Sequence, residues 1–157
     1  MYQKVLLAVD GSDESKAAAR AVTGLIDQGM VKQVIVLNVA ADFTGSTLET
    51  HPTEELAVRI PSTLVEDINK IAIDNGQQIL SEIRIDLPND KNIEIIEKVV
   101  LGDSANTICM EAETNNCDLI VIGSQGKNKN TFRGLFLGSV STRVLQFATC
   151  PVLVIKS

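Results

Sequence analysis

Three short segments of the chain have the residue types and spacing of a phosphate-binding site. Each follows directly on an apolar run, and they are Asp10-Gly11-Ser12, Asn38-Val39-Ala40 and Gly123-Ser124-Gln125-Gly126. Glycines let backbone N–H groups approach a ligand closely, and a helix N-terminus presents unpaired N–H groups with a partial positive charge. The third segment opens the stretch GSQGKNKNTFRGLFLGSVS, in which a helix is expected to begin at Gly138-Ser139. The sequence therefore predicts a glycine-bearing loop that cradles phosphate.

Basic residues concentrate in the same stretch. The 157 residues carry a net charge of -6, yet no acidic residue follows Asp118, and the last 39 residues hold five Lys and Arg. Three of these cations, Lys127, Lys129 and Arg133, lie inside the glycine-bearing loop. A cationic loop on an acidic protein suits a small polyanion better than a nucleic-acid backbone, which needs many clustered cations. The alternative interpretation is that Lys127 and Lys129 are solvated charges of a polar connection.

Five apolar runs must form the strands that position these segments. The chain is 45% hydrophobic, with Ile, Leu and Val at 47 positions and only five aromatic residues. Continuous rather than alternating runs indicate strands that are covered on both faces, as in parallel sheets. The runs are Val5–Val9, Val34–Leu37, Ile93–Val100, Leu119–Ile122 and Val152–Ile155.

Helical patterns separate these runs. Ser12 is placed to cap a helix that continues to about Gln28, and Ser104 to cap one that continues to about Asn115. A 3.6-residue period after Pro61 joins Leu64, Ile68, Ile71, Asn75, Ile79 and Ile83, and a last short helix follows Gly138. This order predicts a single α/β domain over residues 1–157, built on an open doubly wound five-stranded parallel sheet with helices on both faces. Residues 40–60 show no sustained period and are expected to form a surface loop.

Composition argues against several classes of protein. No apolar run reaches the roughly 18 residues of a membrane span, and the N-terminus lacks a secretory pattern, so we expect no membrane association and a cytoplasmic location. Few aromatic side chains are present to stack single-stranded nucleic acid. Cys109, Cys117 and Cys150 form no C-x-x-C pair and are interpreted as small buried hydrophobes, with a reactive thiol as the alternative. His51, the single histidine, is interpreted as a solvated loop residue.

Four segments together resemble the universal stress protein family: KVLLAVDGSDES, DLIVIGSQG, LFLGSVSTRVL and CPVLVIK. The resemblance covers nearly the whole chain and implies strand order 3-2-1-4-5, dimerisation and, in one subgroup, ATP binding. That subgroup is marked by Gly, two residues, Gly, nine residues, then Gly followed by Ser or Thr. Its fixed positions are matched by Gly123, Gly126, Gly138 and Ser139. The spacer of residues 127–137 has 11 residues, two more than the pattern, which enlarges the loop. The preference for ATP over AMP or ADP is therefore left open.

The resemblance also implies roles for individual residues. Asp10 would lie near the ribose and phosphates and hold a divalent cation such as Mg²⁺. Val39 would offer backbone groups to adenine beside an apolar wall of Ala8, Val9 and Ile122. Ribose and phosphates would contact Gly123, Gly126, Lys127, Gly138, Ser139 and Val140. Alternatively, Asp10 only forms the turn before Gly11, and Ser139 only caps a helix.

These observations predict a nucleotide-binding regulatory protein that acts as a dimer and is not an enzyme. A first alternative is an adenylating or ATP-hydrolysing enzyme of the same architecture. With His51 as the single histidine, an H-x-G-H pair is impossible, and residues 10–15 do not form an S-G-G-x-D-S loop. A second alternative is a nucleotide-free dimeric interaction protein. The dimer is expected to form through the C-terminal edge strand, residues 151–156, because an exposed apolar edge invites strand pairing.

Overall fold

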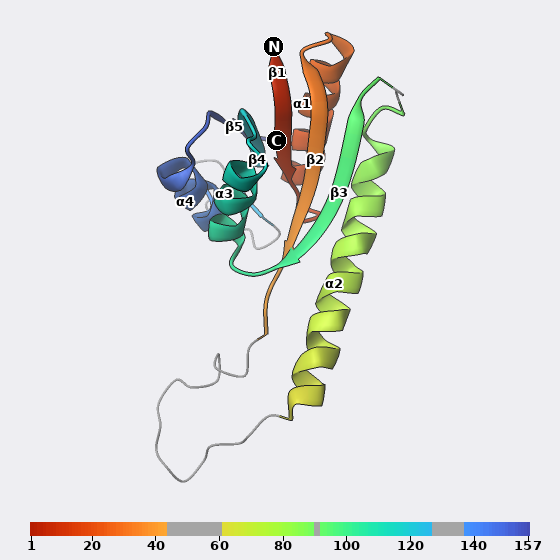
Figure 1. The fold of residues 1–157 in the computed structure, drawn as a ribbon, viewed down its shortest axis with the longest axis vertical. Helices are drawn as coiled ribbons and strands as arrows, with labels where there is room; N and C mark the ends of the chain where they lie inside the picture. Colours follow the sequence, from red (N-terminus) through yellow and green to blue (C-terminus); the bar gives the residue numbers. More distant parts are fainter. Residues whose placement is uncertain (44–60, 90–91, 127–136) are drawn as a thin grey trace.

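The computed structural model describes residues 1–43, 61–89, 92–126 and 137–157, along which strands and helices alternate (Figure 1). The elements are β1 (Tyr2–Ala8), α1 (Asp13–Asp27), β2 (Val31–Ala40), α2 (Ser62–Ile85), β3 (Glu94–Leu101), α3 (Ser104–Thr114), β4 (Leu119–Gly123), α4 (Ser139–Phe147) and β5 (Val152–Ile155). The strands form one parallel sheet in the order β3-β2-β1-β4-β5. The predicted fold class and strand order are therefore confirmed.

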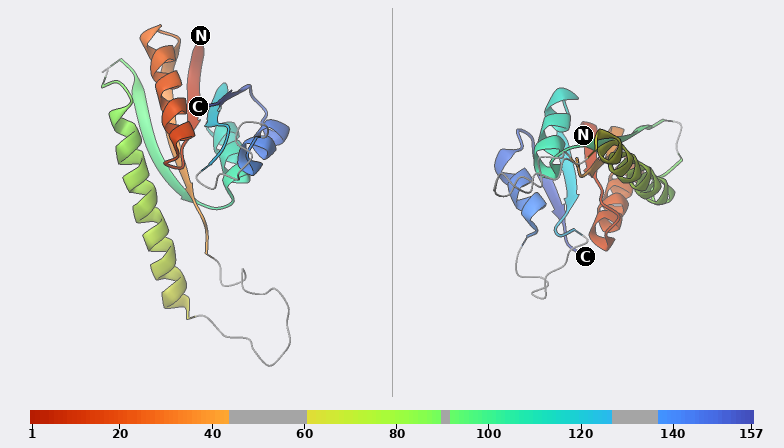
Figure 2. Two further views of the ribbon diagram at one scale, coloured as in Figure 1. Left: turned by 180° about the vertical axis from the view of Figure 1, so that it is seen from behind. Right: turned by 90° about the horizontal axis from the view of Figure 1, so that it is seen from below.

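The central strand β1 is covered on both faces. It pairs with β2 and β4, so that Leu6 lies beside Ile35 on one side and Ile120 on the other. Val5 and Leu7 pack in a cluster with α1 and α2, whereas Leu6 packs in a second cluster with α3 and α4. Figure 2 shows the two pairs of helices on opposite sides of the sheet. Burial on both faces explains why the apolar run of β1 is continuous rather than alternating.

The structure confirms one of the predicted helix caps and corrects another. Ser12 caps α1 as expected, because its hydroxyl accepts from the Ser15 N–H at 3.1 Å. The N-cap of α3 is Asp103 rather than Ser104, since the Asp103 carboxylate accepts from the Asn106 N–H at 3.0 Å. Asp and Ser are comparable N-cap residues, so composition alone does not separate the two positions. The N-cap of α4 is Gly138, which rules out the alternative that Ser139 serves as the cap.

Helix α2 is long, and only its second half packs on the sheet. Figure 1 shows its N-terminal end projecting beyond the strands. The buried positions of the helix are Gly76, Ile79, Leu80 and Ile83. Leu64 and Ile71, which belong to the predicted apolar period, are exposed at 47% and 68%. The period thus predicted the helix correctly and overstated how much of it is buried.

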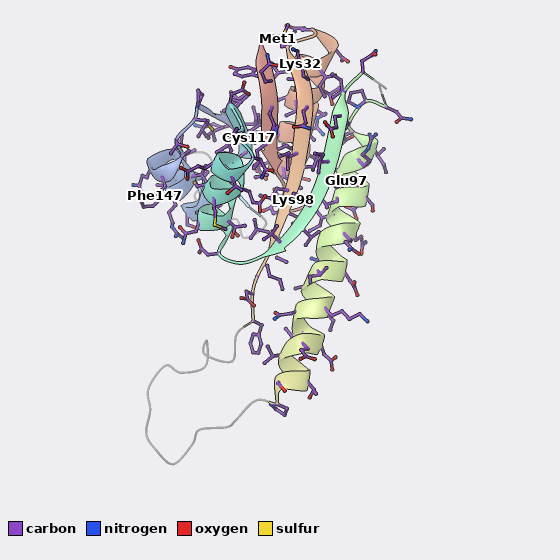
Figure 3. All side chains as sticks on the ribbon, in the orientation of Figure 1. Met1, Lys32, Glu97, Lys98, Cys117 and Phe147 are labelled. Atoms are coloured by element: carbon purple, nitrogen blue, oxygen red, sulfur yellow. The ribbon has the colours of Figure 1, made fainter. Side chains whose placement is uncertain are left out.

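The three cysteines all lie in or against the apolar cluster of α3 and α4. Cys117, labelled in Figure 3, is buried as predicted, whereas Cys109 and Cys150 are only half-buried. Burial raises the pKa of the Cys117 thiol to about 11 and also raises the pKa of Cys109 and Cys150. A raised pKa lowers the thiolate fraction, which disfavours the reactive-thiol alternative. His51 lies outside the described residues, as does most of the predicted 40–60 loop.

None of the helices in the described residues combines the length and apolar character that a bilayer crossing requires.

Candidate functional site

The predicted site residues come together around one cavity of about 660 Å³. It lies at the carboxyl ends of β1, β2 and β4, next to the first residues of α3 and α4. Its lining includes Ala8, Val9, Asp10, Val39, Ile122, Gly123, Gly126, Gly138, Ser139 and Val140. Lys127, with Lys129 and Arg133, lies outside the described residues. The cavity is of the size and position that α/β sheets use for small-molecule ligands.

Asp10 combines the two roles that the sequence left as alternatives. Its Oδ1 accepts the Ser12 N–H at 2.9 Å, and Gly11 has φ +80°, so the carboxylate does shape the turn after β1. Its Oδ2 meanwhile lies close to Gly126 in the lining of the cavity, since a Cβ added at Gly126 would stand 2.7 Å from that oxygen. Asp10 is therefore both a turn residue and a residue of the cavity. A side chain at Gly126 would meet the carboxylate, so that one of the two residues would have to shift.

Gly123 serves helix packing. A Cβ at this position would lie 2.7 Å from Glu14 Cβ and 2.9 Å from the Glu14 carbonyl carbon. The end of β4 therefore approaches the first turn of α1 more closely than any side chain allows. Glu14 is itself buried, and the Ser157 hydroxyl donates to its Oε1 at 3.1 Å. Gly123 thus allows α1 to pack close to the end of β4, beside the cavity.

Hydrogen bonds tie the start of α4 to the end of β4. The Gly138 N–H donates to the Ser124 carbonyl at 2.7 Å, and the Ser141 hydroxyl lies 2.9 Å from the same carbonyl oxygen. These contacts hold Gly126 and Gly138 on one cavity although residues 127–136 separate them. The first N–H groups of a helix have no partner within the helix and attract anions. Ser139 and Val140 therefore bring the N-terminal end of a helix to the cavity.

An ion pair fixes α4 to α3 beside this point. Arg143 donates from Nη1 to Asp103 Oδ1 at 3.0 Å and from Nη2 to Asn106 Oδ1 at 3.1 Å. The hydrogen bond from Arg143 and then that from the Asn106 N–H lower the pKa of Asp103. The helix that starts with the cavity residue Ser104 is thereby joined to the helix that starts with Ser139. Both partners are largely exposed, so the pair orients the helices more than it stabilises them.

The predicted apolar wall needs one correction. Ala8 and Ile122 pack on the α3 and α4 side, where the cavity also meets Leu37 and Ile108. Val9 borders the cavity, but it packs in the cluster on the α1 and α2 side. The alternation of side chains along β1 causes this difference, because neighbouring residues face opposite sides of a sheet.

Sequence reasoning missed several polar residues of the cavity. Ser12 and Gln125 lie in segments that the sequence indicated for phosphate binding, but Ser12 was given a role only as a helix cap and Gln125 none. Ser104 was interpreted only as a helix cap, and Ser15 and Ser141 carried no signal beyond their place near predicted residues. Asp10 is the one titratable side chain among the described lining residues. No group of three or more His, Cys, Asp or Glu in the described ranges could hold a metal ion. The Asp10 carboxylate alone fits Mg²⁺ only where ligand phosphates complete its coordination, which is how Mg²⁺ usually binds with nucleotides.

Solved structures with similar folds include nucleotide complexes. That of the hypothetical protein MJ0577 gives a TM-score of 0.78 at 23% identity, covering 100% of this chain and 97% of that one. A universal stress protein in complex with cAMP gives 0.66 at 21% identity, covering 98% and 97%. The universal stress protein of Archaeoglobus fulgidus in complex with dAMP gives 0.56 at 23% identity, covering 98% of both chains. At these identities the likeness establishes the fold.

Sequence comparison reaches the same group of proteins. The chain is 28% identical over 156 residues to universal stress protein YxiE of Bacillus subtilis, covering 99% of this chain and 100% of that protein. The sequence model of the universal stress protein family matches residues 1–156. That match includes every segment that lines the cavity, from the end of β1 to the start of α4. Taken with the strand order, it shows that the chain belongs to the universal stress protein family.

Proposed function

We propose that this protein binds an adenine nucleotide, ATP, ADP or AMP, in the cavity and acts as a regulatory binding protein. The observation that carries the proposal is the meeting of Asp10, Val39, Gly126 and Ser139, from four separate segments, around one cavity. Together they offer backbone groups at the end of β2, a carboxylate and an anion-binding helix end. Family members with cAMP and dAMP bound support the class of ligand.

Each part of the nucleotide has a proposed place. The base lies between the end of β2 and the apolar side chains of Ala8 and Ile122. The phosphates lie over Gly126, Gly138 and the first turn of α4, where Ser139 and Val140 supply N–H groups. Mg²⁺ is held by the phosphates and the Asp10 carboxylate, and it neutralises the phosphate charge. The cationic residues Lys127, Lys129 and Arg133 are proposed to add to this charge compensation.

Titration calorimetry on nucleotide-stripped protein tests the proposal directly. We expect saturable binding of ATP with Mg²⁺, and also binding of AMP and ADP. GTP at the same concentrations gives the specificity of the site. Absence of measurable heat at millimolar ATP and Mg²⁺ would contradict the proposed function and favour the nucleotide-free dimeric interaction protein.

We further propose binding without rapid turnover. Attack on a phosphate needs a positioned base and a group that stabilises the transition state, and Asp10 is the only titratable side chain among the described lining residues. Phosphate release should therefore be slow compared with dedicated enzymes, whose turnover is on the order of 1 to 1000 per second. A rate in that range would establish the adenylating or hydrolysing enzyme instead.

The assembly is proposed from the edge of the sheet. β5 is the last strand in the order and follows Pro151, and it presents Leu153 at 38% exposure. We propose a homodimer in which residues 151–156 of two copies pair antiparallel, leaving both cavities outside the interface. One nucleotide-binding domain over residues 1–157 and a cytoplasmic location remain predictions alongside it.

A further inference from the structure

Asn38 makes an unusual hydrogen bond at the end of β2. Its side chain is 4% exposed and lies on the α2 side of the sheet, away from the apolar wall of the cavity. The Asn38 amide donates from Nδ2 to the Val9 carbonyl at 2.9 Å. Val9 directly precedes Asp10, so this bond joins the end of β2 to the turn after β1.

The bond takes the place of a rung in the parallel ladder. The Val9 N–H donates to the Leu37 carbonyl at 2.9 Å, and in a regular ladder the Val39 N–H would donate to the Val9 carbonyl next. The hydrogen bonds of the described residues do not include one from the Val39 N–H to the Val9 carbonyl. The Asn38 amide donates to that carbonyl instead. The Val39 N–H is thus left without its usual partner.

The direction of the Val39 backbone groups follows from the neighbouring residue. The Ala40 carbonyl accepts from the Gly102 N–H at 3.0 Å, so the polar groups of Ala40 point toward β3. Neighbouring residues of a strand point their polar groups to opposite sides, so those of Val39 point toward β1. β1 ends at Ala8, and the space beyond it holds the cavity that Val39 lines. The Val39 N–H and carbonyl therefore face the cavity as a donor and an acceptor.

Helix α2 holds Asn38 in this conformation. A Cβ at Gly76 would stand 2.5 Å from Asn38 Oδ1 and 2.8 Å from Val99 Cγ1, so the helix lies directly against the amide. Asn38 Oδ1 has no hydrogen-bond partner among the described residues, which carries a cost for a buried polar atom. A leucine would fill the same volume without that cost. The presence of an amide side chain at position 38 is therefore explained by its N–H donor, which forms a hydrogen bond with the Val9 carbonyl.

We propose that Asn38 is the positioning residue that sets base recognition in the cavity. By occupying the Val9 carbonyl, its amide keeps the Val39 N–H available beside the Val39 C=O, so that the two form a donor and acceptor pair. Adenine offers a matching ring-nitrogen acceptor beside an amino donor, whereas guanine offers a carbonyl acceptor beside a ring N–H donor. The pair therefore selects adenine over guanine. This inference rests on the proposed nucleotide-binding function.

Amide hydrogen exchange of Val39 tests the ladder without any ligand. In nucleotide-free wild-type protein the Val39 amide should exchange much faster than that of Leu37, and ATP with Mg²⁺ should slow it. In Asn38→Leu the ladder can close, so the Val39 amide should be protected in the free protein. Strong protection of Val39 in the nucleotide-free wild type would overturn the inference, whatever its affinity for nucleotides.

Ligand affinities of Asn38→Leu separate base recognition from a general structural role. We expect ATP affinity to fall about tenfold, the effect of losing one or two hydrogen bonds, while inorganic tripolyphosphate binds unchanged. The preference for ATP over GTP should fall by a similar factor. Equal weakening of ATP and tripolyphosphate would show a structural role only and overturn the inference.

Two further variants complete the test. Asn69→Leu is the matched control, because Asn69 also bonds the chain after β2, accepting the Phe43 N–H at 2.9 Å, yet does not line the cavity. It should leave the preference for ATP unchanged. Gly76→Ala displaces Asn38 from behind without altering its amide, so it should lower the same preference. If wild-type protein binds no adenine nucleotide, the proposed function fails. The hydrogen exchange of the Val39 amide still shows whether its N–H pairs with the Val9 carbonyl.

Discussion

Gly126 lies close to the Asp10 carboxylate in the cavity. In Gly126→Val the new Cβ would stand 2.7 Å from Asp10 Oδ2 and force one of the two residues to move. We expect nucleotide affinity to fall by about tenfold or more, because at least one phosphate contact is lost. The melting temperature should change little, since Gly126 lies in a loop. Calorimetry and thermal melting measure the two effects.

Gly24→Ala is the matched control for this variant. A Cβ at Gly24 would meet nothing within 4 Å, so a methyl group there should leave nucleotide affinity unchanged. The melting temperature should rise slightly, because Gly24 lies in α1 and alanine favours a helix over glycine. Unchanged affinity in Gly126→Val would remove Gly126 from the phosphate site.

Asp10 allows its turn and its charge to be separated by one substitution. Asp10→Asn keeps an oxygen that can accept the Ser12 N–H, an interaction of 2.9 Å in the wild type, but removes the negative charge. Binding of ATP should weaken by about tenfold with Mg²⁺ present and hardly at all in EDTA. Titrations in both conditions measure this difference. Equal weakening in the two conditions would show that Asp10 does not hold the cation.

At the scale of elements, the ion pair between Arg143 and Asp103 orients α4 against α3. Because the folded-state pKa of Asp103 is lowered, the stabilisation it provides is present above the ordinary pKa of 3.8 and is lost as the pH falls through the folded value. The difference in melting temperature between wild type and Arg143→Met should therefore be largest near neutral pH and shrink below about pH 4. Thermal melts from pH 3 to about 7 measure it. A difference that is independent of pH would mean that Arg143 acts through its aliphatic stem.

The sequence predicted most elements because their signals are local. The run Val5–Val9 is continuous because both faces of β1 are covered. Gly123 and Gly126 lie where the backbone closely approaches other residues. What it could not supply depends on distant contacts. Nothing near Gly123 in the sequence indicates that Glu14 of α1 packs against it. The proposed role of Asn38 likewise depends on how β1 and β2 are aligned, and a single sequence does not reveal that register.

The exposed edge at β5 concerns the whole molecule. Replacing a residue of this strand by lysine should shift the proposed dimer toward monomer, because pairing would then bury a charge. Leu153 is the suitable position, since it is 38% exposed, whereas Val154 packs in the cluster of α3 and α4. Leu153→Lys should sediment as a monomer at micromolar concentration, with the melting behaviour of a folded chain.

Ile85→Lys is the control for charge alone. Ile85 is 84% exposed at the end of α2, away from β5, so this variant should sediment as the wild type does. Wild-type protein that is monomeric at micromolar concentration would contradict the edge-strand dimer.

The uneven burial of α2 gives the molecule a gradient of local stability. From Ser62 to Asn75 no residue of the helix is buried, whereas burial begins at Gly76 and continues through Ile83. Because the free energy of local opening follows burial, the first turns can unwind while the sheet stays intact. Unwinding that passed Gly76 would release Asn38 and let the ladder of β1 and β2 close. Local unwinding that stops before Gly76 should therefore leave the cavity unchanged, whereas unwinding past Gly76 should alter the edge where the base is proposed to bind.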